Sequence, residues 1–252
     1  MAYSTIIKPT DYFNTKLYTG NGSTNAITGV GFQPDFVWQK SRSNAEGHGL
    51  FDVLRGVTNR IQSNTLNAES SLAGSLQSFD SDGFTVGNDV GANGNGQTFA
   101  SWNWKANGQG SSNTEGSINT TYTSANTTSG FSIIQYTGNA TASATIGHGL
   151  GKIPTMIIFR RYAQAENWDV YHQAIGNAKS IRLNETGAAF DNATALTSTT
   201  PTSNLITLGT SVTTNANGNP MIAYCFADVQ GFSKMGSYIG NGNADGTFVY
   251  TG

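Results

Sequence analysis

The sequence predicts an all-β protein built from two antiparallel β-sandwich modules in tandem. Three observations support this class. Charged residues make up only 11% of the 252 residues, less than half the share of about 25% in an average globular protein. Short runs of β-branched and aromatic residues alternate with Gly, Asn and Asp turn signals. Several motifs recur in the same order along both halves of the chain, as in repeated structural units.

A Tyr-x-Gly-Asn motif is the clearest repeat. It begins at Tyr18, returns at Tyr136, and occurs a third time at Tyr238. After each of the first two copies, a proline leads into an apolar run that ends in a basic residue (34–40 and 154–160). We therefore expect a first sandwich module at 16–106, a second at 131–230, and the start of a truncated third repeat at 231–252. Because this third copy stops before its proline and apolar strand, we expect the native chain to continue past Gly252.

Local patterns place the strands and the connection between the modules. Strands are predicted at 98–104, 131–136 and 207–212, each bounded by turn residues. The only helical candidate is a short stretch within 64–76. Residues 107–130 are rich in Gly, Ser, Asn and Thr and carry one charged side chain, Glu115, which predicts a flexible or extended linker.

Two pairs of aromatic residues lie on strand faces. Side chains on a strand alternate between its faces, so Trp102 and Trp104 share one face, as do their counterparts Tyr224 and Phe226. Such a pair can stack against sugar rings, but it more often belongs to a hydrophobic core. The core interpretation is favoured, and the sugar-stacking interpretation stays open.

The sequence gives little indication of catalysis. We expect that the protein is not an enzyme and that it has no catalytic residue, metal ligand or cofactor. His48 and His148 each lie in a Gly-His-Gly-Leu tetrapeptide, but at different positions relative to the repeated strands, which argues against a pair. His172 follows an apolar strand and is expected to be structural. Characteristic nucleophile, zinc and phosphate-loop motifs are absent from the sequence.

Two further segments have both a chemical and a structural interpretation. Residues 80–83 (DSDG) resemble the opening of a calcium loop, but Gly91 stands where such a loop needs its final Glu. A hairpin turn is therefore favoured over an adventitious calcium site. Cys225 lies within an apolar strand, where a thiol is expected to be buried and unreactive.

Charge and hydropathy exclude several classes of partner. The chain has 13 Lys and Arg against 15 Asp and Glu, so a basic nucleic-acid-binding surface is not expected. No apolar run approaches the 18 residues of a membrane helix, and the first 16 residues lack the apolar core of a signal peptide, so we expect synthesis in the cytoplasm and no membrane insertion. Residues 1–15 are nevertheless predicted to be an anchoring segment that docks on a partner through its apolar residues Tyr3, Ile6, Ile7, Tyr12 and Phe13.

Longer motifs spread over the whole chain are specific enough to indicate a family. They are residues 1–6 (MAYSTI), 9–15 (PTDYFNT), 17–22 (LYTGNG), 33–38 (QPDFVW), 50–56 (LFDVLRG), 78–84 (SFDSDGF), 102–106 (WNWKA), 147–151 (GHGLG), 222–226 (IAYCF) and 229–234 (VQGFSK). With these motifs the chain resembles a family of virion structural proteins from marine tailed phages. The resemblance implies concanavalin-like, jelly-roll-type β-sandwich repeats of tail-fibre-like character. It supplies no catalytic or binding residue.

The function implied is that of a non-enzymatic phage virion protein, made in the host cytoplasm and located in the particle. The leading hypothesis is a tail fibre or receptor-binding component that attaches to a host surface glycan. Its partners would be other virion proteins, and by analogy with fibres it would be a homotrimer. The alternative is a capsid decoration or head-fibre protein anchored through residues 1–15. A second alternative is a free carbohydrate-binding, lectin-like module.

Overall fold

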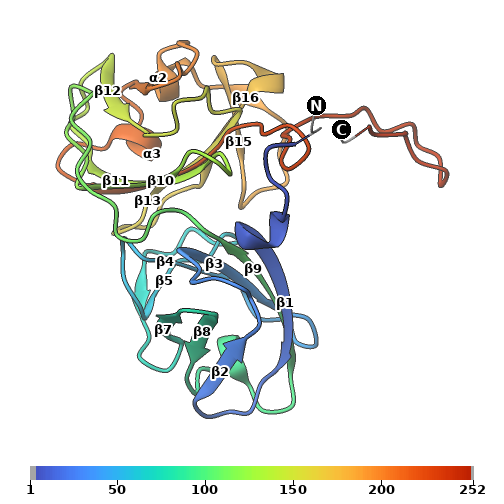
Figure 1. Ribbon diagram of the computed structural model, residues 1–252. Coiled ribbons are helices and arrows are strands. Elements are labelled where there is room, and N and C mark those ends of the chain that lie inside the picture. Colours follow the sequence, from blue (N-terminus) through green and yellow to red (C-terminus); the bar gives the residue numbers. More distant parts are fainter. Residues whose placement is uncertain (1–3, 251–252) are drawn as a thin grey trace.

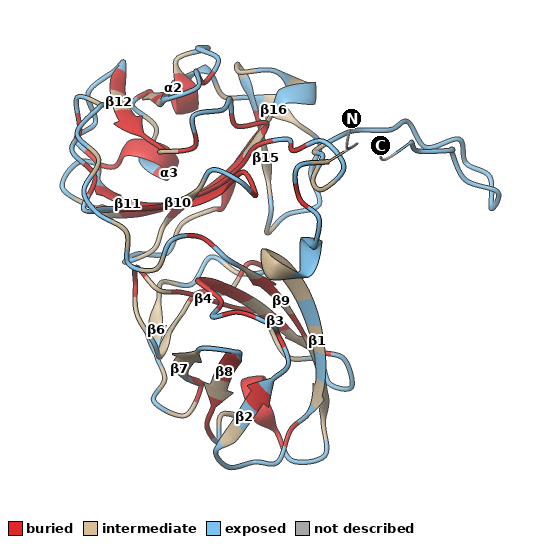
Figure 2. Cartoon of the chain, in the orientation of Figure 1, coloured by how far each residue is buried: buried red, intermediate tan, exposed pale blue. Residues whose placement is uncertain are grey.

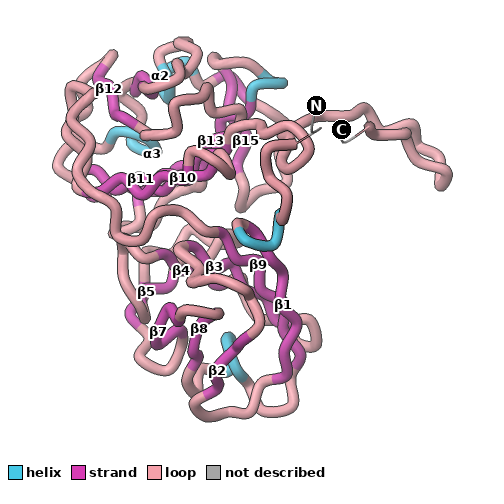
Figure 3. Tube along the Cα trace, in the orientation of Figure 1, coloured by secondary structure: helices cyan, strands magenta, loops and turns pink. Residues whose placement is uncertain are grey.

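The computed structural model describes residues 4–250, and these form an all-β fold (Figure 1). All pairings between the named strands of this part of the chain are antiparallel, and the sheets pack face to face as in β-sandwiches. The helices are single turns, shown in cyan in Figure 3: η1 (Pro9–Asp11), α1 (Val90–Asn93), η2 (Gln173–Ile175), α2 (Ala193–Leu196) and α3 (Val212–Asn215). None of the described helices is long and apolar enough to cross a membrane.

The first half of the chain forms two facing sheets. The larger sheet has four strands in the spatial order β1 (Phe13–Thr19), β9 (Thr98–Trp104), β3 (Phe36–Ser41) and β4 (Gly49–Asp52). The smaller sheet has the order β2 (Asn25–Thr28), β8 (Gly83–Val86) and β7 (Leu76–Asp80), and a short pair is formed by β5 (Asn59–Arg60) and β6 (Ser70–Ser71). Val37, Phe51 and Phe84 are among the buried residues that fill the space between these two sheets.

The second half also forms two facing sheets. The larger has the order β10 (Tyr122–Asn126), β11 (Phe131–Thr137), β18 (Pro220–Phe226), β13 (Met156–Arg161), β14 (Asp169–His172), β15 (Lys179–Arg182) and β16 (Phe190–Asp191). The smaller consists of β12 (Ala144–Gly147) and β17 (Leu205–Leu208). Tyr136, Ile157 and Ile206 are among the buried residues that pack between them.

A third core joins the two halves, because the four-stranded sheet also packs against the seven-stranded sheet. Phe36 on β3 stacks on Tyr224 on β18 with their ring centroids 4.4 Å apart. Along β18 the side chains alternate, so that Met221 and Ala223 face the core of the second half while Ile222 and Tyr224 face the first half. Four sheets are therefore stacked in layers, and the two central sheets have buried residues on both faces (Figure 2).

The same local contacts recur at corresponding positions of the two halves. Tyr18 donates a hydrogen bond from its Oη to the carbonyl oxygen of Ala92 (2.7 Å), and Tyr136 donates to that of Thr214 (2.5 Å). The side-chain oxygen of Asn93 accepts from the backbone N–H of Asn21, and that of Asn215 accepts from Asn139. The motifs that repeat in the sequence therefore hold their turns by the same contacts in each half.

Three sequence-based expectations differ from the structure. The strand predicted at 207–212 is instead β17 (Leu205–Leu208), and the chain then turns into α3 (Val212–Asn215). Within the predicted linker 107–130, Tyr122–Asn126 form β10, which pairs with β11 at the edge of the seven-stranded sheet. Small polar residues resemble a linker in composition, yet they pair readily where an open strand edge offers backbone hydrogen bonds. The helix predicted within 64–76 is wrong, because this stretch contains β6 and turns. Ser, Asn and Gly there favour turns over helix.

Candidate ligand-binding site

The clearest candidate site is a hollow of about 250 Å³ on the four-stranded sheet, lined by Trp38, His48, Trp102 and Trp104. The pairing of β3 with β9 places Trp38 opposite Trp102 and Phe36 opposite Trp104. Because side chains alternate along strands, the three indole rings lie on the face that is turned toward the second half. The seven-stranded sheet covers only part of this face: Phe36 is 1% exposed, whereas the three tryptophans are half-buried.

The rings around the hollow are held by contacts within the first half. Trp104 packs against Phe13 and Phe36, with ring centroids 4.8 and 5.2 Å apart. The indole Nε1–H of Trp38 donates a hydrogen bond to Nδ1 of His48 over 2.8 Å. Burial, and then the nearby charge of Lys40, lower the pKa of His48, which keeps this ring neutral and able to accept that bond at pH 7. A ligand would therefore meet rings that are already ordered, which reduces the entropy cost of binding.

A second, smaller chamber of about 160 Å³ shares Trp38 and Trp104 with the hollow. Both halves of the chain and both terminal segments contribute to its walls. The other lining residues are Tyr12, Ser129, Phe131, Met156, Ile158, Phe226, Phe232, Ser233 and Met235. Tyr12 and Phe232 meet edge to face over 6.2 Å, so the two terminal segments contact each other beside the chamber. The hollow on the first half and the chamber between the halves together form a mostly aromatic site.

The predicted N-terminal docking residues do not form one exposed surface. Tyr3 lies outside the described residues. Ile6 is 5% exposed, Ile7 is 97% exposed, and Tyr12 and Phe13 are partly buried against Phe232 and Trp104. Much of the apolar character of this segment therefore serves packing within the chain, and its docking on a partner stays a prediction. Of the four described residues in the set, Ile7 alone is fully available to a partner.

The two aromatic pairs have different environments. Tyr224 and Phe226 are buried in the core between the halves, as predicted. Trp104 packs against the edge of that core, and Trp102 is half-buried beside it, so the core interpretation is only partly right for the first pair. Trp38 could not be predicted as their neighbour, because the pairing of β3 with β9 is not visible in either segment alone.

The histidines lie in different surroundings. His48 borders the hollow in the first half, while His148 is fully buried in the second half, where its Nδ1 accepts from the backbone N–H of Leu150. Burial lowers the pKa of His148. Nδ1 of His172 accepts from the backbone N–H of Ala174 at the start of η2. Within residues 4–250, no group of three or more His, Cys, Asp or Glu side chains is arranged to hold a metal ion.

Residues 80–83 and Cys225 have the structural roles favoured by the sequence. Asp80 pairs with Gly83 across the β7–β8 hairpin turn. The carboxylate of Asp82 accepts the backbone N–H groups of Gly29 (2.9 Å) and Gly31 (2.7 Å), and these bonds lower its pKa. Cys225 is fully buried, and its burial raises the thiol pKa to about 12, so the reactive thiolate is suppressed.

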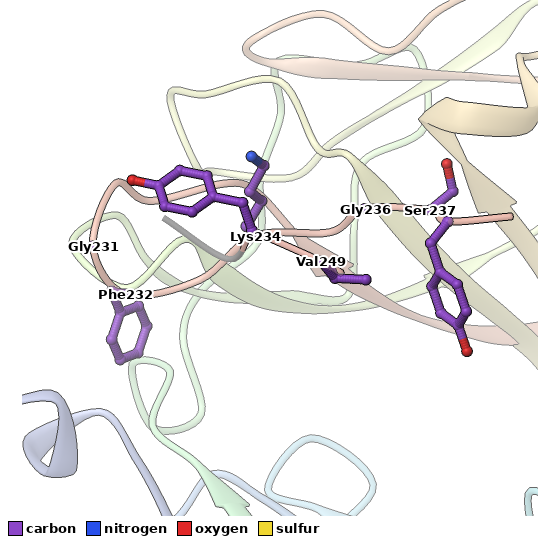
Figure 4. Close-up of a pocket in the computed structure, with 8 residues that line it drawn as sticks. Gly231, Phe232, Lys234, Gly236, Ser237 and Val249 are labelled. Atoms are coloured by element: carbon purple, nitrogen blue, oxygen red, sulfur yellow. The ribbon is translucent and has the colours of Figure 1, made fainter. Parts of the chain in front are cut away.

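A larger hollow is less suited to binding. It measures about 540 Å³ and lies along the C-terminal segment, where it is lined mainly by residues 231–238 and by Val249 and Tyr250. In Figure 4 the side chains of Phe232, Lys234 and Val249 point in different directions instead of converging. Residues 231–250 form no strand, and most of their side chains are exposed. A specific pocket needs convergent groups on a fixed framework, which the tryptophan hollow provides and this segment does not.

The chain is thus a protein of stacked β-sheets, and its aromatic hollow is a candidate binding surface. Over residues 8–252 the chain matches a family described as a domain of unknown function (DUF7483), and it belongs to that family. No curated protein and no solved structure matches the chain.

Proposed function

We propose that this chain is a non-enzymatic structural protein of a phage virion, most consistent with a tail fibre or receptor-binding component that attaches to carbohydrate on the host surface. The motifs that resemble virion proteins of tailed phages support its place in the particle. The observation that carries the binding role is the half-open face of Trp38, Trp102 and Trp104. The two matching sets of turn contacts further support tandem sandwich modules within the proposal.

Carbohydrate is the ligand class that best fits this face. One side of a pyranose ring presents C–H groups that pack on aromatic rings, and its hydroxyl groups remain in water at the rim. The hollow offers three indoles and one imidazole, and no carboxylate lines it. Hydrolysis of glycosidic bonds ordinarily uses a pair of carboxylates at the scissile bond. The lining therefore supports binding of a glycan without its cleavage.

The test is binding of the purified full chain to host cells and to polysaccharide extracted from their surface. Replacing Trp102→Ala removes one ring of the hollow, and we expect affinity to fall about tenfold, a typical loss for one aromatic contact. Leu17→Ala is the matched control, because Leu17 is 61% exposed on the same face of the sheet but outside the lining of the hollow. A wild-type chain that binds neither cells nor polysaccharide, or equal binding by all three proteins, would refute the proposal.

A capsid decoration protein is the second candidate, and the terminal segments favour it. Ile7, Ile239 and Phe248 are 97%, 87% and 88% exposed, an unusual concentration of apolar surface on two segments that contact each other through Tyr12 and Phe232. Such surface suits attachment to a larger assembly. A chain that lacks residues 1–7 retains η1 and β1, so loss of its incorporation into particles, with cell binding intact, would favour anchoring through this end.

A further inference from the structure

We infer that the chamber beside the tryptophan hollow is a subsite for an N-acetyl group, so that the ligand is a glycan containing N-acetylated amino sugars. This inference rests on the proposed carbohydrate-binding role of the hollow. It concerns the chamber lined by Ser129, which shares Trp38 and Trp104 with the hollow. A sugar ring stacked on the indoles would therefore lie next to the chamber.

The walls of the chamber are predominantly apolar. Phe131, Met156, Ile158 and Phe226 come from the central strands β11, β13 and β18, and aromatic and methionine side chains of the terminal segments complete the enclosure. Its volume of about 160 Å³ exceeds the roughly 30 Å³ occupied by one water molecule. The chamber is therefore large enough for a substituent of several atoms and suited to one that ends in a methyl group.

One polar residue of these walls has a hydroxyl without a partner. Ser129 is 4% exposed, lines the chamber, and its hydroxyl has no hydrogen-bond partner among the described residues. Because the hydroxyl oxygen itself is closed to solvent, it meets a ligand in the chamber only after rotation about its Cα–Cβ bond. The residue is fixed in the turn between β10 and β11, because its backbone N–H donates to the side-chain oxygen of Asn126 over 3.0 Å. A buried hydroxyl without a partner costs free energy, so a ligand that supplies one hydrogen bond is favoured here.

An acetamido group matches both properties. Its methyl group needs apolar walls, and its amide can exchange one hydrogen bond with a serine hydroxyl. A plain sugar hydroxyl in the same position could also bond to Ser129, but it would leave the apolar walls without contact. The chamber therefore selects for N-acetylated sugars over the corresponding sugars that carry hydroxyl groups alone.

The test compares two disaccharides that share a β-1,4 glucan backbone, N,N'-diacetylchitobiose and cellobiose, by calorimetry with the full chain. We expect the acetylated sugar to bind at least tenfold more tightly, and Ser129→Ala to reduce that ratio about tenfold, as expected for the loss of a buried hydrogen bond. Ser75→Ala is the matched control, because Ser75 is also fully buried with an unpaired hydroxyl but lies outside the chamber. It should leave the ratio unchanged.

Saturation-transfer NMR on the wild-type chain supplies a second measurement that needs no variant. The acetyl methyl protons should receive more saturation from the protein than the sugar ring protons, because they would lie among Phe131, Met156 and Ile158. Equal affinities for the two sugars, or weak saturation of the methyl group, would overturn the inference that the chamber is an N-acetyl subsite. If Trp102→Ala still weakens binding of either sugar or of host polysaccharide, the proposed function survives that result. Failure of the wild-type chain to bind any of these carbohydrates would overturn both.

Discussion

Replacing Tyr224→Phe should show how strongly a buried charge network ties the two halves together. The Oη of Tyr224 in the second half donates a hydrogen bond to Oδ2 of Asp52 in the first half over 2.7 Å. Oδ2 of Asp52 also accepts a hydrogen bond from Nε of Arg55 over 2.6 Å, and Nη1 of Arg55 lies 2.7 Å from Oε2 of Glu69. Burial opposes the charge on Arg55, but the charges of Asp52 and Glu69 outweigh it and hold its pKa above the usual value.

The expected loss follows from the nature of the acceptor. A hydrogen bond to a charged group contributes about 1.5–3 kcal/mol, so we expect Tyr224→Phe to lower the free energy of unfolding by about 2 kcal/mol. In this variant Asp52 would still accept hydrogen bonds from the Arg55 side chain and from the backbone N–H of Leu54. The loss of unfolding free energy should therefore stay below the 3–5 kcal/mol typical of breaking a buried ion pair. For a chain of this size the melting temperature should fall by about 6 °C.

Tyr136→Phe is the matched control for this experiment. Tyr136 is also fully buried and loses the same atom, but its Oη donates to a neutral carbonyl, that of Thr214 in its own half. This variant should cost about 1 kcal/mol. Urea denaturation followed by tryptophan fluorescence measures both changes. If Tyr224→Phe costs no more than Tyr136→Phe, the charge network adds nothing to the contact between the halves and the reasoning fails.

Two further predictions concern the hollow and the repeated turns. Because the pKa of folded His48 lies below its ordinary value of 6.5, neutral His48 contributes stability above that pH, and this contribution is lost as the pH falls through the folded pKa. The NMR signal of the Trp38 indole N–H should therefore shift on acidification at a pH below 6.5, and a signal that stays constant until the protein unfolds would contradict the Trp38–His48 bond. Asn93→Ala and Asn215→Ala should each lower the free energy of unfolding, measured by urea denaturation, by about 3 kcal/mol, since each removes several buried hydrogen bonds. Costs that differ by more than about 2 kcal/mol would show that the two turns are not equivalent.

The strands could be predicted from the sequence better than their layering. The segments 98–104 and 131–136 coincide with β9 and most of β11, because alternation and turn residues define strands locally. The run from Phe36 to Trp38 is apolar without interruption, a signal of a strand buried on both faces, and the structure places its residues in two different cores. What the sequence does not state is which sheet covers which face.

The candidate site was harder to predict for the same reason. Trp102 and Trp104 could be assigned to one face, but their exposure depends on where the seven-stranded sheet ends, which is a property of tertiary packing. The sequence singles out His48 only through the resemblance of its surroundings to those of His148, whereas its actual partner is Trp38, ten residues earlier on β3. The apolar N-terminal segment suggested a partner, but Phe13 instead contacts a tryptophan that lies 91 positions away in the same chain, at position 104.

The position of β18 inside the seven-stranded sheet, between β11 and β13, has a consequence for synthesis on the ribosome. β11 and β13 both pair with this last strand, so their sheet cannot be completed before Phe226 has left the exit tunnel. The first half has all its own strands by Trp104, yet its aromatic face stays uncovered while the second half is translated. During that interval the nascent chain presents a wide apolar surface, the kind that aggregates or recruits chaperones. The pace of translation through the second half therefore bears directly on the yield of folded protein.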